Sequence, residues 1–396
     1  MNEDRFSGTL YQKFPITIEK GNGINVVDTN GKKYIDCIGG YGVALIGHSN
    51  KRLLNSITEQ LTKIITVHSS LYNKTREKFL ENIVKISPKK LSNVYLSNSG
   101  SESVEAAIKF ARKFSKKTGI ISMTGAYHGK TIGALSITHS SKYRLSFKPL
   151  LKDVSFAKFN DIESLQSLIN DNTGTIIIEP IQGENGIYLP NYKFLENVRK
   201  ICDELNILLI FDEIQSGLGR TGKMWAAEHW NTIPDIMCLA KGIAGGLPMG
   251  ATLVRQDILS CIKKGEHSST FGGNPLSCAA GNAVIETIIE ENLISNAQKE
   301  GELLLTGLKD LKMRHTIIRE IRGKGLMIGI ELKFDIKQII LDGIKHGLLL
   351  LYSGRNIIRL LPPLILNKDN VISILNILDI LFAREEKRRN AQRQNR

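Results

Sequence analysis

Residues 207–223 read ILLIFDEIQSGLGRTGK, and this stretch decides the fold. Ile207 to Phe211 form a nearly continuous apolar run, which is typical of a strand in a parallel sheet that is covered on both faces. Asp212 and Glu213 follow directly. A carboxylate is therefore expected at the C-terminal end of the strand, where open α/β sheets bind their ligands.

Similar apolar runs alternate with longer amphipathic stretches over residues 93–290. The runs are NVYLS (93–97), GIISM (119–123) and TIII (175–178), and helical patterns cover 102–117 and 191–205. Such alternation indicates βαβ units joined by right-handed crossovers. We predict an α/β fold with a large doubly wound domain and a mainly parallel sheet.

The pattern changes near residue 291 to that of a smaller α+β domain. A long helix is expected at 292–312, strands in IREIRGKGLMIGIELK (318–333), a short helix at 335–346 and a closing helix at 368–383. Hairpin-like strands near the N-terminus, with turns at 21–23 and 29–31, are expected to join this domain. The predicted division is an N-terminal segment 1–50, a large domain 51–290, a small domain 291–383 and a disordered basic tail 384–396.

Composition narrows the class of protein. The 396 residues are too many for one ordinary core, and 42% hydrophobic and 23% charged residues are close to globular averages. No apolar run approaches the length of a membrane span, and the start, MNEDRFSGTLYQ, lacks the apolar core of a secretory signal. Five widely spaced cysteines without CxxC spacing argue against disulfides and zinc. We expect a soluble cytoplasmic protein without a metal.

The net charge of +14 would suit nucleic acid, an acidic membrane surface or an acidic protein partner. The tail 384–396 contributes six basic and two acidic residues, so most of the excess lies elsewhere. No basic run is interleaved with aromatic residues there, which disfavours nucleic acid. An acidic partner and a mere effect of composition or solubility both remain as explanations.

A lysine follows another apolar stretch, Ile236 to Ala240. Lys241 lies 29 residues after Asp212, so the two side chains can meet across one crevice. A lysine amine in a partly dry site can form a Schiff base, and a buried aspartate can keep a pyridinium nitrogen charged. The alternative is a strand-end cap and an unrelated surface lysine.

Two further motifs can bind phosphate. Asn98 to Glu102, NSGSE, stands between a strand and a helix, where free amides, serine hydroxyls and a glycine form a phosphate cup. The same residues match a capping box, which alone would only cap the helix. Gly217 to Met224, GLGRTGKM, nearly matches a nucleotide-binding P-loop, but Met224 replaces the hydroxyl residue that binds magnesium. A P-loop nucleotide enzyme is the alternative of another class.

Together these features resemble the class III aminotransferases of the fold type I pyridoxal-phosphate superfamily, to about residue 383. The matching stretches are NSGSESVEAAIKFAR, AYHGKTIGALSIT, IIIEPIQGENG, LLIFDEIQSGLGRTGKMWAAE, DIMCLAKGIAGGLPMGA, HSSTFGGNPLSCAA and IREIRGKGLMIGIELK. The resemblance implies an aminotransferase with pyridoxal 5′-phosphate as its cofactor.

By this resemblance, Lys241 forms the Schiff base and shuttles protons, while Asp212 pairs with the pyridine nitrogen. Gln215 bonds the phenolic oxygen, and Tyr127 stacks on the ring with Glu179 beside it. The alternative for Tyr127 is a half-buried core aromatic. The remaining implied cofactor residues are Gly100 and Ser101 at the phosphate, Thr270 from the neighbouring subunit, Glu213 and Ile214. A homodimer with shared sites follows.

Within the class, the chain is most similar to the acetylornithine aminotransferase group, especially its archaeal branch acting on lysine or ornithine linked to the acidic LysW carrier protein. Arg359 matches the arginine that grips a substrate carboxylate, and Glu184 the glutamate that can neutralise it. Ser269 and Lys130 are further implied substrate residues. Relatives usually have arginine at the position of Lys130 and glycine at that of Asn185, and a lysine lacks the arginine fork.

The resulting hypothesis is a pyridoxal-phosphate aminotransferase of lysine or arginine biosynthesis. It would move the terminal amino group of an N-blocked diamino acid to 2-oxoglutarate, giving glutamate. The first alternative is a plain acetylornithine aminotransferase of arginine biosynthesis. No partner other than a second subunit, these small molecules and an acidic carrier is expected.

Overall fold

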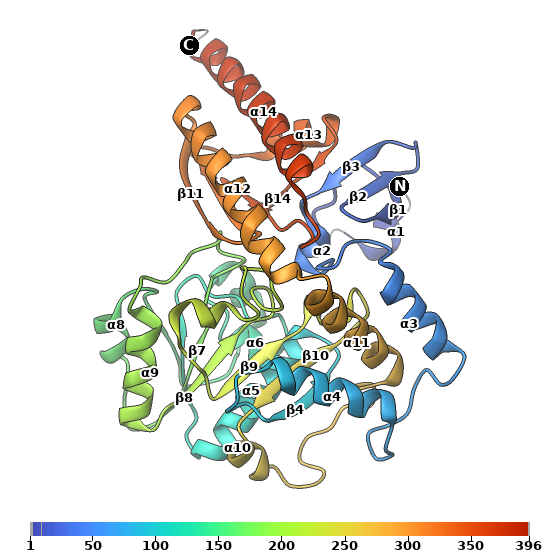
Figure 1. The fold of residues 1–396 in the computed structure, drawn as a ribbon. Helices are drawn as coiled ribbons and strands as arrows, with labels where there is room; N and C mark the ends of the chain where they lie inside the picture. Colours follow the sequence, from blue (N-terminus) through green and yellow to red (C-terminus); the bar gives the residue numbers. More distant parts are fainter. Residues whose placement is uncertain (1–2, 9, 395–396) are drawn as a thin grey trace.

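The structure is a computed structural model, and it describes residues 3–8 and 10–394. Among these residues, a seven-stranded sheet forms the centre of the larger half of the molecule (Figure 1). Its strands, in spatial order, are β4 (Asn93–Ser97), β10 (Gly250–Val254), β9 (Ile236–Leu239), β8 (Leu208–Asp212), β7 (Thr173–Ile178), β5 (Gly119–Met123) and β6 (Val154–Ala157). β10 runs antiparallel to its neighbours, and the strands from β9 to β6 are parallel. The predicted α/β fold with a mainly parallel sheet is confirmed.

Helices cover both faces of this sheet, which explains its nearly continuous apolar strands. Along β7, Ile177 packs in the cluster that contains α5 (Gly100–Ser115). Its neighbours Ile176 and Ile178 pack in the cluster that contains α9 (Phe194–Leu205). The expected helices at 102–117 and 191–205 are therefore present, each displaced by two or three residues at its start.

The other helical segments of this half surround the sheet. They are α3 (Lys51–Leu61), α4 (Lys74–Ile86), α6 (Ile132–Ser136), α7 (Ser141–Arg144), η1 (Leu145–Phe147), α8 (Ile162–Gln166), η2 (Ala226–Trp230), η3 (Lys241–Ala244), α10 (Gln256–Ser260) and α11 (Pro275–Glu290). Buried residues occur all round α11, and several of them join the largest core cluster.

Both tryptophans of the chain lie at η2. Trp225 is 1% exposed, belongs to the largest core cluster, and donates its indole N–H to the carbonyl of Ile86 at 2.9 Å. Trp230 packs against the cluster of α9 and against a smaller one around Ile181. This short segment therefore joins three apolar clusters.

Two four-stranded sheets make up the smaller half. The first contains β1 (Ile18–Asn22), β2 (Asn25–Asp28), β3 (Lys33–Asp36) and β13 (Leu348–Leu349), so N-terminal and C-terminal segments share one sheet. The second contains β11 (Ile318–Lys324), β12 (Met327–Leu332), β15 (Ile357–Leu360) and β14 (Leu351–Ser353). The helices of this half are α1 (Glu3–Ser7), α2 (Gly39–Gly42), α12 (Leu293–Arg314), α13 (Lys337–Lys345) and α14 (Lys368–Gln394).

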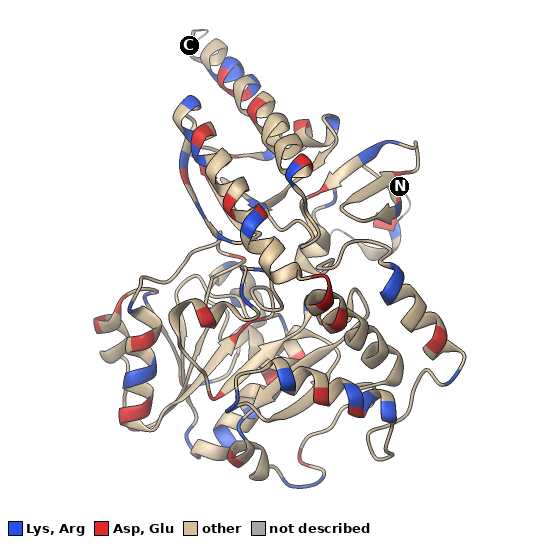
Figure 2. Ribbon diagram, in the orientation of Figure 1, with Lys and Arg blue, Asp and Glu red and all other residues tan. Residues whose placement is uncertain are grey.

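The basic tail was expected to be disordered over 384–396; in the structure α14 continues to Gln394 and projects from the body (Figure 1), and residues 395–396 lie outside the described residues. Glu385 is 3% exposed and accepts hydrogen bonds from Arg388 at 2.7 Å and Arg389 at 2.6 Å, one helical turn away. Glu386 bonds His315 at 3.0 Å, which attaches this part of α14 to the end of α12. In Figure 2, basic and acidic residues are interleaved over both halves.

No helix within the described ranges is both long enough and apolar enough to cross a membrane. The same residues contain no group of three or more His, Cys, Asp or Glu side chains placed to hold a metal ion. All five cysteines are free thiols, of which Cys261 is exposed.

Candidate functional site

A cleft of about 880 Å³ opens at the carboxyl ends of the central strands. Five of its polar lining residues follow five different strands: Ser101 after β4, Tyr127 after β5, Glu179 after β7, Asp212 at the end of β8 and Lys241 after β9. The expected meeting of Asp212 and Lys241 in one crevice is therefore confirmed. Lys241 lines the cleft, so the alternative of an unrelated surface lysine is wrong.

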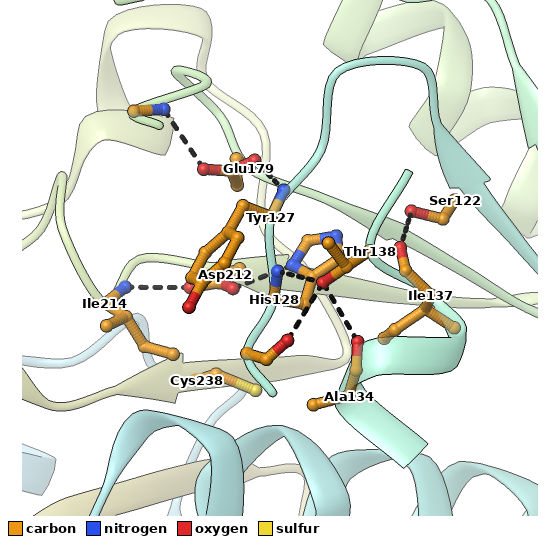
Figure 3. Close-up of polar contacts among 12 residues, drawn as sticks. Ser122, Tyr127, His128, Ala134, Ile137, Thr138, Glu179, Asp212, Ile214 and Cys238 are labelled. Atoms are coloured by element: carbon orange, nitrogen blue, oxygen red, sulfur yellow. Dashed lines mark hydrogen bonds and ion pairs between the residues drawn. The ribbon is translucent and has the colours of Figure 1, made fainter. Parts of the chain in front are cut away.

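Asp212 is 5% exposed and is held by two donors. Its Oδ1 accepts from the amide of Ile214 at 3.1 Å, and its Oδ2 lies 2.8 Å from Nδ1 of His128 (Figure 3). Nε2 of His128 is buried without a partner among the described residues. A neutral imidazole with its proton on Nδ1, donating to Asp212, best satisfies this arrangement. The amide of His128 donates to Thr138 Oγ1 at 3.0 Å, which fixes the backbone beside the ring.

Glu179 lies next to this pair and holds the backbone of Tyr127. Its carboxylate accepts from the amides of Tyr127 and Gly183, each at 3.0 Å. Burial raises the pKa of Glu179 to about 7, and the nearby Asp212 acts in the same direction. Tyr127 is half-buried and lines the cleft, with its pKa raised to about 12 by burial. Its ring is therefore available to a ligand rather than enclosed in the core.

Lys241 opens η3 with a positive φ of 47°. Residues held in this region are strained, and the surrounding structure must impose the conformation. Burial lowers the pKa of Lys241, and Arg359 adds to this, whereas Asp212 raises it. A lowered pKa increases the fraction of neutral amine, which is the nucleophilic form.

The start of α5 lies at one end of the cleft. Ser99 caps the helix, since its Oγ accepts from the amide of Glu102 at 3.2 Å. The side chain of Glu102 accepts from the amide of Asn98 at 2.8 Å. In an ordinary capping box the glutamate would accept from the amide of the N-cap residue, which here is Ser99. A Cβ at Gly100 would lie 3.0 Å from the side chain of Ile214. Gly100 and Ser101 line the cleft, where their free amides can bind a phosphate.

An ion pair closes another wall of the cleft. Arg359, on β15, is fully buried, and its Nη2 lies 2.9 Å from Oε2 of Glu184. Its Nη1 donates to Oε1 of Gln215 at 3.2 Å. Glu184 is one-third exposed and lines the cleft with Gln215, so an entering carboxylate can compete for the guanidinium.

The outer part of the cleft is cationic and aromatic. The ammonium groups of Lys130 and Lys142 lie 5.1 Å and 5.8 Å from the centre of the Tyr143 ring. Tyr11 and Tyr41 line the same cleft. This combination can bind the anionic end of a ligand while its apolar part contacts the rings.

Four implied residues do not line the cleft: Arg359 is buried against Glu184 and Gln215, and Glu213, Ser269 and Thr270 lie outside it. The side chain of Glu213 bonds within the protein: it accepts from Ser216 Oγ at 2.5 Å and from the amides of Ala226 and Ala227 at 3.1 Å and 2.8 Å. Burial raises the pKa of Glu213 to about 7. Ser269 and Thr270 line an adjacent depression of about 300 Å³, next to Asn98.

The P-loop alternative is wrong. Gly217 to Gly222 are buried, and the segment leads into the short η2 rather than a long helix. Arg220 is fully buried and donates to the carbonyls of Leu326 and Pro362. A buried loop that packs inside the protein cannot hold a nucleotide phosphate.

The donor set of the cleft fits pyridoxal 5′-phosphate. The amides at the start of α5 suit its phosphate, the buried Asp212 suits a protonated ring nitrogen, and Lys241 with its lowered pKa suits an aldehyde. His128 was not identified as a site residue from the sequence, although it stands in the AYHGKT stretch next to Tyr127. Only the fold shows that it reaches Asp212, 84 residues away.

Comparisons with known proteins agree with this arrangement. The family model described as Aminotransferase class-III matches residues 7–381. The chain is 39% identical over 370 residues to a protein named acetylornithine aminotransferase from Methanopyrus kandleri, covering 93% of this chain and 94% of the relative. It is 42% identical over 384 residues to a protein named ornithine aminotransferase 1 from Staphylococcus saprophyticus, covering 95% and 96%.

A solved structure has the same fold. The ornithine aminotransferase of Toxoplasma gondii superposes with a TM-score of 0.94 at 29% identity, covering 98% of this chain and 94% of that one. Its active site holds pyridoxal phosphate at partial occupancy.

Proposed function

The chain belongs to the class III aminotransferases, fold type I enzymes that depend on pyridoxal 5′-phosphate, and from this premise we propose that it moves the terminal amino group of an N-blocked diamino acid to 2-oxoglutarate. This reaction would place it in ornithine and arginine metabolism. The observation that carries the proposal is the ion pair between Arg359 and Glu184 in the wall of the cleft.

An enzyme of this kind must accept two unlike substrates in turn at one site. A dicarboxylate such as 2-oxoglutarate needs a free cation, and Arg359 supplies a planar, two-pronged donor. A terminal amine carries no carboxylate at the reacting end, and it needs that cation neutralised. Glu184, at 2.9 Å from Arg359, provides this neutralisation and is exposed enough to move aside.

The residues that would hold the cofactor come from the strand ends. Lys241 would hold it through its amine, Asp212 through the ring nitrogen, Gly100 and Ser101 through the phosphate, Gln215 through the phenolic oxygen, and Tyr127 by stacking. When bound, pyridoxal 5′-phosphate supplies an electron sink for the carbon that loses its proton.

The protein's own contribution is orientation and proton transfer. Nζ of Lys241 would accept the proton from the donor carbon that loses its amino group, and in the second half of the exchange it would deliver a proton to the carbon of 2-oxoglutarate that gains the amino group. His128 holds the Asp212 carboxylate in its orientation by donating from Nδ1 at 2.8 Å. Asp212 and His128 are buried and bonded to each other without a ligand, so this part of the site is oriented in advance.

The far end of the amino donor would lie against Lys130 and Lys142. Three carboxylates of this chain line the cleft: Asp212, Glu179 and Glu184. All three belong to its inner part, where they bond His128, backbone amides or Arg359. A free α-ammonium at the far end would meet two lysines and no carboxylate of this chain, so a blocked α-amine is favoured.

The blocking group has two candidates. An acetyl group is supported by the relatives named acetylornithine aminotransferase. An acidic carrier protein of the LysW kind, on lysine or ornithine, is supported by the net charge of +14, which complements an acidic partner. The second candidate would add lysine synthesis to the role of the enzyme.

We propose further that two copies of the chain share their active sites. Thr270 and Ser269 lie outside the cleft of their own chain, next to the phosphate end. Large apolar side chains are exposed on the neighbouring segments, including Ile65, Leu71 and Phe271. Such surface is typical of subunit interfaces. Sedimentation of the holoenzyme should give twice the chain mass.

A direct assay tests the proposed reaction. The holoenzyme is supplied with 2-oxoglutarate and, separately, N-acetylornithine, free ornithine or a simple terminal amine, and glutamate is measured. N-acetylornithine should give the highest kcat/KM of the three. A preference for free ornithine would reject the blocked donor but leave the aminotransferase class in place.

A further inference from the structure

The loop that carries Glu184 is a strained hairpin. Gln182 and Tyr188 exchange backbone hydrogen bonds of 3.0 Å and 3.2 Å, which closes a turn over residues 183–187. Gly186 has a φ of 118° and Ile187 a φ of 59°. A positive φ is rare for a β-branched residue, so the turn keeps this shape only because its surroundings impose it.

The hairpin packs against three adjacent residues on strands β11, β12 and β15 of the smaller half. In the registers of β11, β12 and β15, Arg322 pairs with Gly329, and Gly329 pairs with Arg359. Cross-strand partners project from the same face of a sheet, so the two arginines flank the glycine. A Cβ at Gly329 would lie 2.8 Å from the carbonyl oxygen of Gly186, so only glycine lets the hairpin sit so close.

The two arginines hold different parts of the hairpin. Arg359 bonds the Glu184 side chain at 2.9 Å, and Nε of Arg322 donates to the carbonyl of Gly186 at 2.9 Å. The Arg322 guanidinium also lies 3.9 Å from the centre of the Tyr188 ring. Its Nη1 bonds Glu320 and Glu331, both at 2.8 Å, and the side chain is 7% exposed.

We propose that Arg322 is a positioning residue that holds the 182–188 hairpin on the sheet and thereby sets how strongly Glu184 competes with a substrate carboxylate for Arg359. Ser353 assists by donating its hydroxyl to the carbonyl of Glu184. Arg322 is not among the residues that line the cleft, and its influence passes through the hairpin. This inference rests on the proposed exchange of substrates at Arg359.

The test compares Arg322 with Arg319 on the same strand. Arg319 bonds Glu331 at 3.0 Å, as Arg322 does, but it is 58% exposed and makes no hydrogen bond to the hairpin among the described residues. Arg322→Met removes the donor to Gly186, and Arg319→Met is the matched control. Arg322→Lys keeps a cation for the two glutamates but loses Nε and the flat stacking surface. Circular dichroism and Tm establish that each variant is folded.

The first readout is the Kd of glutarate, an unreactive dicarboxylate, measured by calorimetry on the holoenzyme. Release of the hairpin should weaken the hold of Glu184 on Arg359, so Arg322→Met should bind glutarate about three- to tenfold more tightly. Arg322→Lys should move in the same direction, and Arg319→Met should stay within about twofold of the wild type. The kcat/KM for N-acetylornithine should fall in both Arg322 variants.

A double-mutant cycle decides whether the effect passes through Glu184. Glu184→Gln should tighten glutarate binding by itself, and adding Arg322→Met should then change the Kd little further. An equal effect of Arg322→Met with and without the Glu184 carboxylate would overturn the proposal, as would equal glutarate binding in both Arg322 variants and the control. Failure of the wild type to use N-acetylornithine would reject the proposed donor alone, because glutarate binding does not depend on it.

Discussion

Nδ1 of His128 lies 2.8 Å from Oδ2 of Asp212 (Figure 3), and the two side chains are buried at the wall of the cleft. The histidine donates to the carboxylate that faces the proposed ring nitrogen. The amide of Ile214 donates to the other oxygen at 3.1 Å. Asp212 is therefore oriented before any ligand enters.

Asp212→Asn should cut turnover by about 100-fold or more, because a neutral amide cannot keep the ring nitrogen protonated. The cofactor should remain bound, as judged by its absorbance. His128→Ala should give a smaller loss, since the carboxylate survives but loses its donor. Unchanged turnover in the Asp212 variant would reduce that residue to a cap at the end of β8.

Lys241→Ala should abolish turnover while leaving Tm close to that of the wild type, because the amine contributes chemistry and little packing. Steady-state assays and thermal unfolding measure the two effects. The control is Lys223→Ala in the P-loop-like stretch, where Lys223 is exposed. Its turnover should be normal. More than a few per cent of activity in the Lys241 variant would contradict the assignment of the base.

Arg359→Lys should raise the KM for 2-oxoglutarate by about tenfold or more with little change in cofactor binding, because the charge remains but the fork is lost. Arg355→Lys is the control, since Arg355 is 91% exposed near the same strand. Initial rates at varied 2-oxoglutarate provide the measurement. Equal KM values in all three proteins would move carboxylate binding to another residue.

Glu213→Gln should reduce the pH dependence of stability. Burial raises the pKa of Glu213 from 4.5 to about 7, so the folded protein keeps a proton that the unfolded chain releases. The stabilisation is complete below the unfolded pKa and is lost as pH rises towards about 7. The wild-type Tm should therefore fall more than that of the variant between about pH 5 and about pH 8.

Glu204→Gln is the control for this comparison, because Glu204 is exposed on α9. Its Tm should follow the wild-type curve. The Glu213 variant should also keep most of its turnover, as expected for a residue that bonds Ser216 and two backbone amides rather than the cofactor. A loss of cofactor binding in the Glu213 variant would support the cofactor-binding role that the resemblance implies for Glu213.

The two candidate blocking groups differ in their response to salt. Complementary charge speeds encounter with an acidic carrier and is screened over a Debye length of about 10 Å at 0.1 M salt. The kcat/KM for a carrier-linked donor should therefore fall steeply between low and moderate salt, while that for N-acetylornithine should barely change. Parallel curves would reject the carrier and leave the acetylated donor.

Local sequence patterns were sufficient to predict the central sheet, because strands such as Ile176 to Ile178 are apolar on both faces and end at polar residues. The positions of Asp212 and Lys241 followed from the same rule. The extension of α14 was missed, since residues 384–394 are polar in sequence and their order depends on contacts such as that of Glu386 with His315. The hydrophobic periodicity of a sequence does not show which distant residue will form an ion pair or hydrogen bond with a charged side chain.

Other parts of the site depend on contacts between distant segments. His128 and Asp212 are far apart in sequence, and Arg322 reaches a hairpin 136 residues earlier. Glu213 adjoins Asp212 in sequence, but its side chain bonds Ser216 and two backbone amides, because successive side chains of an extended segment point in opposite directions. A resemblance assigns one role to a whole stretch of sequence, whereas neighbouring residues of that stretch can face different parts of the fold.

The position of both tryptophans at one short helix has a practical consequence for spectroscopy. Trp225 is enclosed in the largest core cluster, and Trp230 borders two others. Tryptophan fluorescence therefore reports on this junction alone. It does not detect local unfolding of α14 or of the N-terminal strands. A fluorescence-detected transition that precedes the one seen by circular dichroism would mean that the junction loosens before the helices melt.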